Sequence, residues 1–267
     1  MTILSNIFSK KISGNLLGAV VILLSVLSCK DKNDAPSPNP DETIGSTGKV
    51  TFTYRGKQVT YITVRAKDGN IWSQQNLGST RVATHMKDTL AYGDFFQWGR
   101  WDDGHQVRRP VANTVTGSSI ENNPSGVKNL NPAPFVSNWW NGGSQNDLWA
   151  ANTGKEATAA NGCDPCKAMG QGWRLPTDDE WTNLAELEEI KNSETAFNSL
   201  LLIPTGGWRS TTNPSSLSAV GADSWYWTST AAGGYGKGVW LLPGTIRKSY
   251  SDNRSWGTSI RCIRPGK

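Results

Sequence analysis

Tryptophan and glycine, rather than long aliphatic runs, constrain what this chain can fold into. It has 13 tryptophans and 28 glycines in 267 residues. Each buried indole covers a large apolar area, so aromatic side chains can supply much of a core. Long periodic helices are largely absent, and glycine-rich turns separate short aromatic segments. This pattern predicts a loop-rich domain of the mainly β or α+β class.

The first 29 residues have the features of an export signal. Lys10 and Lys11 precede an apolar run, Leu16 to Leu27, that is shorter than the ~20 residues of a membrane-spanning helix. The run ends at Ser28 and Cys29, as in bacterial lipoprotein signals, in which the cysteine is lipidated. We therefore expect an exported protein, anchored through a lipid on Cys29 at the outer membrane or cell surface. An ordinary cleaved signal with an incidental cysteine is the alternative.

A polar tether follows the signal and precedes one large domain. Residues 30–48 are rich in proline and small polar side chains, which predicts a flexible linker with little to bury. The domain, residues 49–267, is long enough for a substantial core. Without the two lysines of the signal, 27 basic residues become 25, and 25 minus 22 acids gives +3. No basic block stands out, so we expect no nucleic-acid partner.

Alternating patterns predict strands at both ends of the domain. Val50–Tyr54 and Val59–Val64 flank a short turn and predict a β-hairpin. Ile71 and Trp72 are expected to continue this sheet. Three further strands, separated by glycine-rich or polar turns, are predicted over Ser224–Thr230, Lys237–Leu242 and Thr258–Arg264.

Two helices are predicted between these strands. Thr177 begins the first, which extends to Ile190, because Thr177 and Glu180 form a capping box. The second is predicted over Glu194–Leu201 with Ser193 as its cap. Residues 78–160 show no period, and we expect their aromatic islands to fix this irregular segment to the core.

Three cysteines follow Cys29: Cys163, Cys166 and Cys262. Zinc needs about four ligands, and the two histidines have no metal spacing around them, so we expect no metal. The Cys-x-x-Cys pair precedes a loop, unlike the strand-to-helix junction of a thioredoxin-type site. Export favours disulfides. The residues predict a bridge from Cys262 to one member of the pair, worth ~4 kcal/mol by loop entropy; a bridge within the pair is the open alternative.

No catalytic pattern stands out in the chain. It has no Gly-x-Ser-x-Gly elbow, no phosphate-binding loop and no His-Glu-x-x-His helix. A carboxylate pair for glycoside hydrolysis stays open, but nothing selects two of the 22 acids. We therefore expect no enzyme activity and no cofactor.

Tryptophans serve either as core residues or as ligand platforms. Trp173, Trp181, Trp225 and Trp227 are expected in the core, the last two because they alternate onto one face of a strand. Aromatic, arginine and asparagine residues gather near the C-terminus, which is the composition of a binding surface. A polar loop without a ligand is the alternative. The candidate ligand-binding residues are Tyr235, Lys237, Trp240, Arg247, Tyr250, Asp252, Asn253, Arg254 and Trp256.

Six motifs occur in an order that resembles a known family: NIWSQQNLGSTRVA, YGDFFQWGRWDDGHQVR, NDLW, DPCKAMGQGWRLPTDDEW, YWTST and SIRCIRP. They resemble the Fibrobacter succinogenes major paralogous domain, common in exported proteins of Bacteroidetes and Fibrobacteres, over residues 51–264. The resemblance implies a C-type-lectin-like α+β fold, with its ends together and a disulfide between Cys166 and Cys262. In relatives diversified by retroelements the C-terminal face contacts the ligand, and residues 235–256 match that face by position.

Three functions are consistent with these features. We expect a lipid-anchored, non-catalytic surface module that binds a glycan or protein ligand through its C-terminal loops. An enzyme of the formylglycine-generating type is the second, which by resemblance would use a reactive cysteine pair with bound copper. The third is a structural component of a surface assembly. The sequence lacks the tripeptide with which animal lectins bind sugars through calcium.

Overall fold

The computed structural model describes residues 43–108, 135, 139–140, 143–151, 161–210 and 216–266. These residues belong to one compact unit, Pro38–Lys267. The predicted signal segment, the lipidation site Cys29 and residues 30–42 of the predicted linker lie outside the described residues. Neither of the α-helices in the described ranges is long and apolar enough to cross a membrane.

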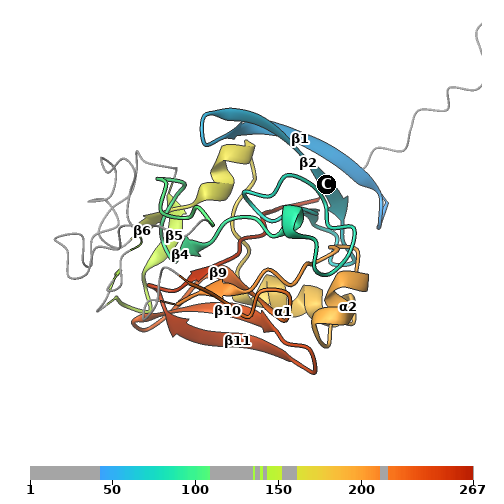
Figure 1. Cartoon of the computed structure of the whole chain (residues 1–267). Coiled ribbons are helices and arrows are strands. Elements are labelled where there is room, and N and C mark those ends of the chain that lie inside the picture. The colour runs from blue at the N-terminus through green and yellow to red at the C-terminus, as the bar shows by residue number, and fades with distance from the viewer. Residues whose placement is uncertain are drawn as a thin grey trace, which may run out of the picture. The chain divides into compact units, whose positions relative to one another are not determined.

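The predicted N-terminal hairpin is confirmed (Figure 1). Its strands are β1 (Thr47–Tyr54) and β2 (Lys57–Arg65). Arg55 and Gly56 form the turn with φ of 50° and 73°, the left-handed values that a type I′ turn requires. The hairpin begins two residues inside the predicted linker, because Thr47 already pairs with β2.

The first and last strands of the domain belong to one antiparallel sheet, in the order β1-β2-β3-β13. β3 (Ile71–Ser73) contains the two residues that were expected to continue the hairpin. It pairs with β2 on one side and with β13 (Ile263–Arg264) on the other. The chain therefore closes by placing its last strand against an early one.

Helix α1 (Asp178–Leu187) has the predicted start. Thr177 accepts from the Glu180 N–H, and the Glu180 side chain accepts from the Thr177 N–H, which is the expected capping box. The helix ends before the predicted Ile190, because Glu189 adopts φ of 58° and the Ile190 N–H turns back to the carbonyl of Ala185.

Helix α2 (Ser193–Asn198) is shorter than predicted, and its cap is Asn192 rather than Ser193. The Asn192 side chain accepts from the Thr195 N–H, while Ser193 lies inside the first turn and is buried. Asparagine and serine both cap helices well, so the two neighbouring candidates could not be ranked from sequence.

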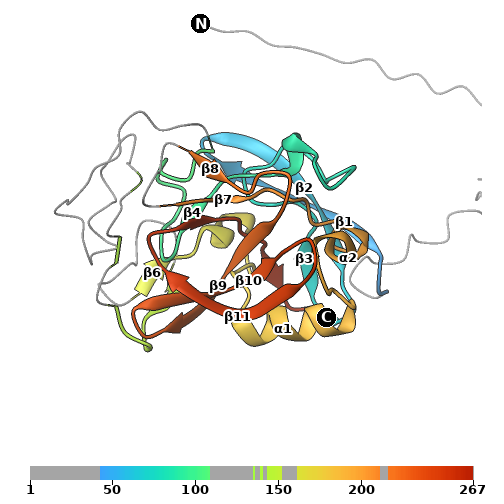
Figure 2. The same ribbon diagram turned by 60° about the horizontal axis from the view of Figure 1, so that its bottom comes forward.

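A second antiparallel sheet has the order β11-β10-β9 and lies against α1 (Figures 1 and 2). β9 (Ser224–Ala232) and β10 (Tyr235–Leu241) correspond to predicted strands. β11 (Ile246–Asn253) was predicted as a polar turn. As the outer strand, it has no fully buried residue, and so its sequence carries no apolar alternation.

Shorter elements complete the described part of the chain. One sheet has the order β4-β12-β7-β8, and β5 pairs with β6 in parallel. Their bounds are Phe96–Gln97 (β4), Gly257–Thr258 (β12), Trp208–Arg209 (β7), Leu217–Ser218 (β8), Leu148–Ala151 (β5) and Asn161–Cys163 (β6). Two 3-10 helices are η1 (Thr89–Ala91) and η3 (Pro165–Met169).

The prediction of one strand over Thr258–Arg264 was wrong. Its first residue belongs to β12 and its last two form β13, in different sheets. The residues between them are fully buried, because the chain crosses the core from one sheet to the other. Apolar and polar residues are interspersed throughout Thr258–Arg264, so the sequence pattern does not show that the strand pairing changes from one sheet to another.

Indoles hold the core together, as the composition predicts. Trp173, Trp181, Trp225 and Trp227 are all buried. In the irregular segment, Trp98 donates to the Thr228 carbonyl and Trp149 to the Cys163 carbonyl, at 2.9 and 2.8 Å. The described structure is thus mixed and sheet-rich, with mostly antiparallel sheets and few helices, which agrees with the α+β prediction at that level.

Candidate functional site

The predicted binding segment folds as a hairpin, β10–β11, rather than as loops. Leu242 and Thr245 close its turn by a backbone hydrogen bond of 2.9 Å, with Pro243 and Gly244 between them. On β10 and β11, Trp240 lies opposite Arg247. The candidate site is therefore a sheet surface whose side chains are positioned by strand pairing.

Five aromatic side chains meet on the sheet surface opposite α1, and we call this set the aromatic face. Trp208 and Trp256 are stacked, with ring centroids 4.6 Å apart. Trp225 and Trp240 are also stacked, with ring centroids 5.9 Å apart. The ring centroid of Tyr250 lies 5.5 Å from that of Trp225 and 5.3 Å from that of Trp240. Trp225 is fully buried, whereas the other four rings are partly exposed.

Two glycines of β10 make room for the indoles. A Cβ atom on Gly238 would lie 2.6 Å from Trp225 Nε1, and one on Gly236 would lie 2.4 Å from Trp98 Cδ1. The sequence predicted a glycine-rich turn between the strands Ser224–Thr230 and Lys237–Leu242, but the chain turns only at residues 233–234. The other glycines are needed because rings pack directly on the strand backbone.

Arg247 lies across the rings of the aromatic face. Its Cζ is 5.1 Å from the ring centroid of Trp240 and 5.7 Å from that of Tyr250. The side chain is exposed, and no acid among the described residues forms an ion pair with it. Contact with the ring faces therefore positions a cation that has no acidic partner in the described structure.

A buried carboxylate fixes the orientation of Trp240. Asp223 Oδ2 accepts from Trp240 Nε1 at 3.0 Å, while Asp223 Oδ1 has no partner among the described residues. Asp223 is 6% exposed, and this burial raises its pKa to about 6. Sequence reasoning missed both Asp223 and Trp208, because they lie outside the C-terminal segment and follow no motif.

Lys237 lies on the opposite side of the sheet. Its Nζ is 3.0 Å from Asp178 Oδ2, which also accepts from Ser249 Oγ at 2.6 Å. Lys248 Nζ donates to Glu186 on the same helix at 2.7 Å. The structure therefore assigns the predicted ligand-binding residue Lys237 to the contact with α1, away from the aromatic face.

Arg254 is a core residue, and this corrects its prediction as a ligand contact. It is fully buried, with Cζ 4.2 Å from the ring centroid of Trp98 and 4.8 Å from that of Trp140. Its guanidinium forms an ion pair with Asp147 and also donates to the carbonyl of Gly233. A buried cation requires such partners, and these contacts hold the start of the hairpin in place.

The remaining predicted residues lie toward the other end of the hairpin. Tyr235 is 54% exposed and pairs with Asn253, which accepts from Ser255 and shapes the following turn. Asp252 is half-buried, and this burial raises its pKa. Of the nine candidates, the structure gathers four on the aromatic face: Trp240, Arg247, Tyr250 and Trp256.

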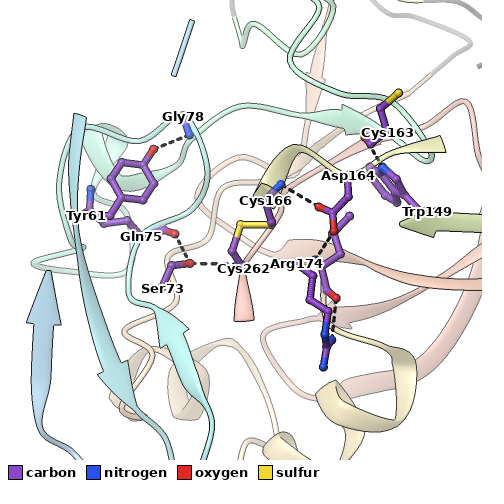
Figure 3. Close-up of a disulfide and its surroundings, with 11 residues drawn as sticks. Tyr61, Ser73, Gln75, Gly78, Trp149, Cys163, Asp164, Cys166, Arg174 and Cys262 are labelled. Atoms are coloured by element: carbon purple, nitrogen blue, oxygen red, sulfur yellow. Dashed lines mark hydrogen bonds between the residues drawn. A yellow bond between two sulfur atoms is a disulfide. The ribbon is translucent and has the colours of Figure 1, made fainter. Parts of the chain in front are cut away.

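Figure 3 shows the disulfide between Cys166 in η3 and Cys262 next to β13. The two Cα atoms are 5.5 Å apart, and both residues are buried. This is the pairing that the family resemblance implied. Cys163 is also buried and carries a thiol, which points away from the disulfide (Figure 3). The bridge joins the segment before α1 to the last strand.

Asp164 positions the first half of this bridge. Its Oδ1 accepts from the Cys166 N–H at 2.8 Å (Figure 3). Its Oδ2 accepts from the Leu175 N–H at 2.9 Å. Burial raises the pKa of Asp164 to about 7. The carboxyl is thus used to cap η3 and to hold the next loop, which is a structural role.

A separate pocket of 410 Å³ lies between the tip of the first hairpin and the loop at Gly78. Tyr54, Arg55 and Tyr61 contribute to its walls. Arg55 forms an ion pair with Asp94 at 3.7 Å, so this cation has an acidic partner. The described residues hold no group of three histidine, cysteine or acidic side chains that could bind a metal.

No family model matches the chain, and neither a curated protein nor a solved structure matches it. Its function is therefore inferred from the geometry of the aromatic face. Partly exposed rings offer flat apolar surfaces, and Arg247 offers hydrogen-bond donors beside them. Such a surface can stack on a sugar ring or a planar group and pair with a polar substituent.

Proposed function

We propose that this chain is a non-catalytic binding module, displayed at the cell surface, that recognises a glycan or protein ligand through the aromatic face. The observation that carries the proposal is that Trp240, Tyr250 and Trp256 stay partly exposed although each of them packs on another ring of the aromatic face. Rings that are already ordered give contact area while losing little entropy on binding. Arg247 adds directional donors to the same surface.

The proposal includes a lipid anchor at Cys29 and a tether that holds the domain away from the membrane. The support is the sequence pattern of the signal segment. Cells that express the chain and are fed a labelled fatty acid should yield labelled protein. The Cys29→Ser variant should be unlabelled, and label that persists in it would exclude lipidation at this residue.

We also propose that the domain is C-type-lectin-like. Two features support this: the first and last strands share one sheet, and a disulfide attaches the segment before α1 to the end of the chain. The same disulfide favours a structural role for its sulfurs over the reactive pair of a formylglycine-generating enzyme. Titration of the native protein should find no accessible thiol at Cys166 or Cys262; two accessible thiols there would favour the enzyme.

A binding screen of the purified full chain against glycan and protein arrays tests the main proposal. The matched variant changes Trp240, Arg247, Tyr250 and Trp256 to alanine, and Lys248→Ala on the helix side of the sheet is the control. We expect the fourfold variant to lose binding and the control to keep it, with circular dichroism confirming that both are folded. Binding that survives the four changes would show that the aromatic face is not the site.

A further inference from the structure

We infer that the ligand of the aromatic face is a glycan that carries a carboxylate, and that Arg247 is the residue that pairs with this carboxylate. This inference rests on the proposed function, since it names the ligand class of the same surface. It comes from comparing the cations of the C-terminal hairpin with one another.

All cations of residues 235–256 except Arg247 have an acidic partner in the structure. Lys237 Nζ lies 3.0 Å from an Asp178 oxygen, and Lys248 Nζ lies 2.7 Å from a Glu186 oxygen. Arg254 forms an ion pair with Asp147 in the core. Among the described residues, no acid forms an ion pair with Arg247, although its side chain is exposed beside two rings. Arg247 is therefore the cation available to an anionic group of a ligand.

Among the described residues, no group accepts a hydrogen bond from Arg247, so its donors are available for that group. A guanidinium carries five N–H donors, and those that no protein group accepts can be offered to a ligand. The acid that hydrogen-bonds to these rings, Asp223, is buried and accepts from Trp240 at 3.0 Å, and it forms no ion pair with Arg247. Arginine and carboxylate form paired hydrogen bonds of fixed geometry, which makes a carboxylate the best-matched anion.

The surrounding rings favour a sugar as the carrier of the carboxylate. Trp240, Tyr250 and Trp256 are partly exposed neighbours in one cluster around Trp225. A sugar ring has an apolar C–H face that can stack on such indoles while a substituent at its edge reaches Arg247. An acidic side chain of a protein has no comparable flat face, so the rings would add little to its binding.

Calorimetric titration of the full chain with trigalacturonate and with its methyl ester tests the inference, because the two probes differ in the carboxylates alone. We expect the free acid to bind about ten- to a hundredfold more tightly, the range for a charged hydrogen bond. Arg247→Gln should remove this difference, and Arg247→Lys should restore part of it. Lys248→Gln, a loss of the neighbouring but paired cation, should leave the difference unchanged.

The outcomes separate this inference from the proposed function. If Trp240→Ala abolishes binding of both probes but Arg247→Gln leaves their ratio unchanged, the carboxylate pairing is wrong and the binding face stands. Uronate binding that is untouched by Trp240→Ala would overturn both. The inference also fails if no uronate oligosaccharide binds the wild-type chain, if only a sulfated neutral oligosaccharide binds, or if only acidic peptides bind.

Discussion

The two faces of the β9–β10–β11 sheet differ in burial and charge pairing, although the side chains of both faces come from the same strands. On the helix side, Tyr226, Val239 and Leu241 are fully buried and pack with the apolar side chains of α1. The cations on that side, Lys237 and Lys248, are paired with acids of the helix. On the other side, four rings are partly exposed and Arg247 has no acidic partner among the described residues.

This difference separates residues that stabilise the domain from residues that are available to a ligand. Successive side chains of a strand point to opposite faces, so neighbours such as Trp225 and Tyr226 enter different clusters. Apolar burial and paired charges on the helix side give stability. Exposed aromatic side chains contribute less to stability, and an exposed apolar patch on one face is typical of a binding site.

The largest expected effect is the loss of the disulfide, which supports both faces. The bridge spans 96 residues, and a loop of this length contributes about 4–5 kcal/mol in the chain-entropy treatment. Cys262→Ser should therefore lower the free energy of unfolding by about that amount, as measured in urea. Cys163→Ser is the control, since Cys163 lies outside this bridge. Equal losses in the two variants would contradict the structural role of the bridge.

Replacing one tryptophan on each face separates stability from binding. Trp181 is fully buried against Trp72 and Tyr226, so Trp181→Ala should cost about 3–5 kcal/mol. Trp240→Ala should cost less, because Trp240 is partly exposed, yet it should remove ligand binding. Urea unfolding and calorimetric titration measure the two effects. The comparison breaks if both variants lose stability and binding in the same proportion.

A methyl group on Gly238 tests how closely the rings pack on β10. Since its Cβ would lie 2.5 Å from the Tyr226 carbonyl oxygen and 2.6 Å from Trp225, Gly238→Ala should destabilise the domain by about 1–3 kcal/mol. A Cβ atom on Gly244, in the exposed turn, would have no other atom within 4 Å, so Gly244→Ala is the matched control. Thermal melting that fails to distinguish the two variants would show that the aromatic face tolerates looser packing.

The smallest expected effect is a pH dependence that Asp223 contributes. Its pKa in the fold, about 6, lies above the ordinary value of 3.8, so the folded state holds a proton that the unfolded state releases. The contribution of Asp223 to the free energy of unfolding should rise as pH falls through 6 toward 4. Asp223→Asn keeps an oxygen for Trp240 and should flatten this part of the profile. Identical profiles of stability against pH for the wild type and the variant would contradict the raised pKa of the buried Asp223 carboxyl.

The features that the sequence determined by itself are local ones. Arg55-Gly56 sets a type I′ hairpin, and Thr177 with Glu180 starts α1, because in each case the deciding contacts join residues a few positions apart. The tryptophan content also predicted an aromatic core. By contrast, the choice of Cys166 as the partner of Cys262 came from the family resemblance, since the spacing alone left it open.

Only the tertiary structure decided which candidates share a surface. Arg254 is a core residue because Asp147, 107 positions away, neutralises it. Edge strand β11 forms because β10 lies beside it, and its own polar sequence does not require a strand. Trp208 and Asp223 reach the aromatic face only after β7 and β9 are assembled. Long-range pairing sets burial, and burial decides whether a polar or aromatic side chain stabilises the fold or faces a ligand.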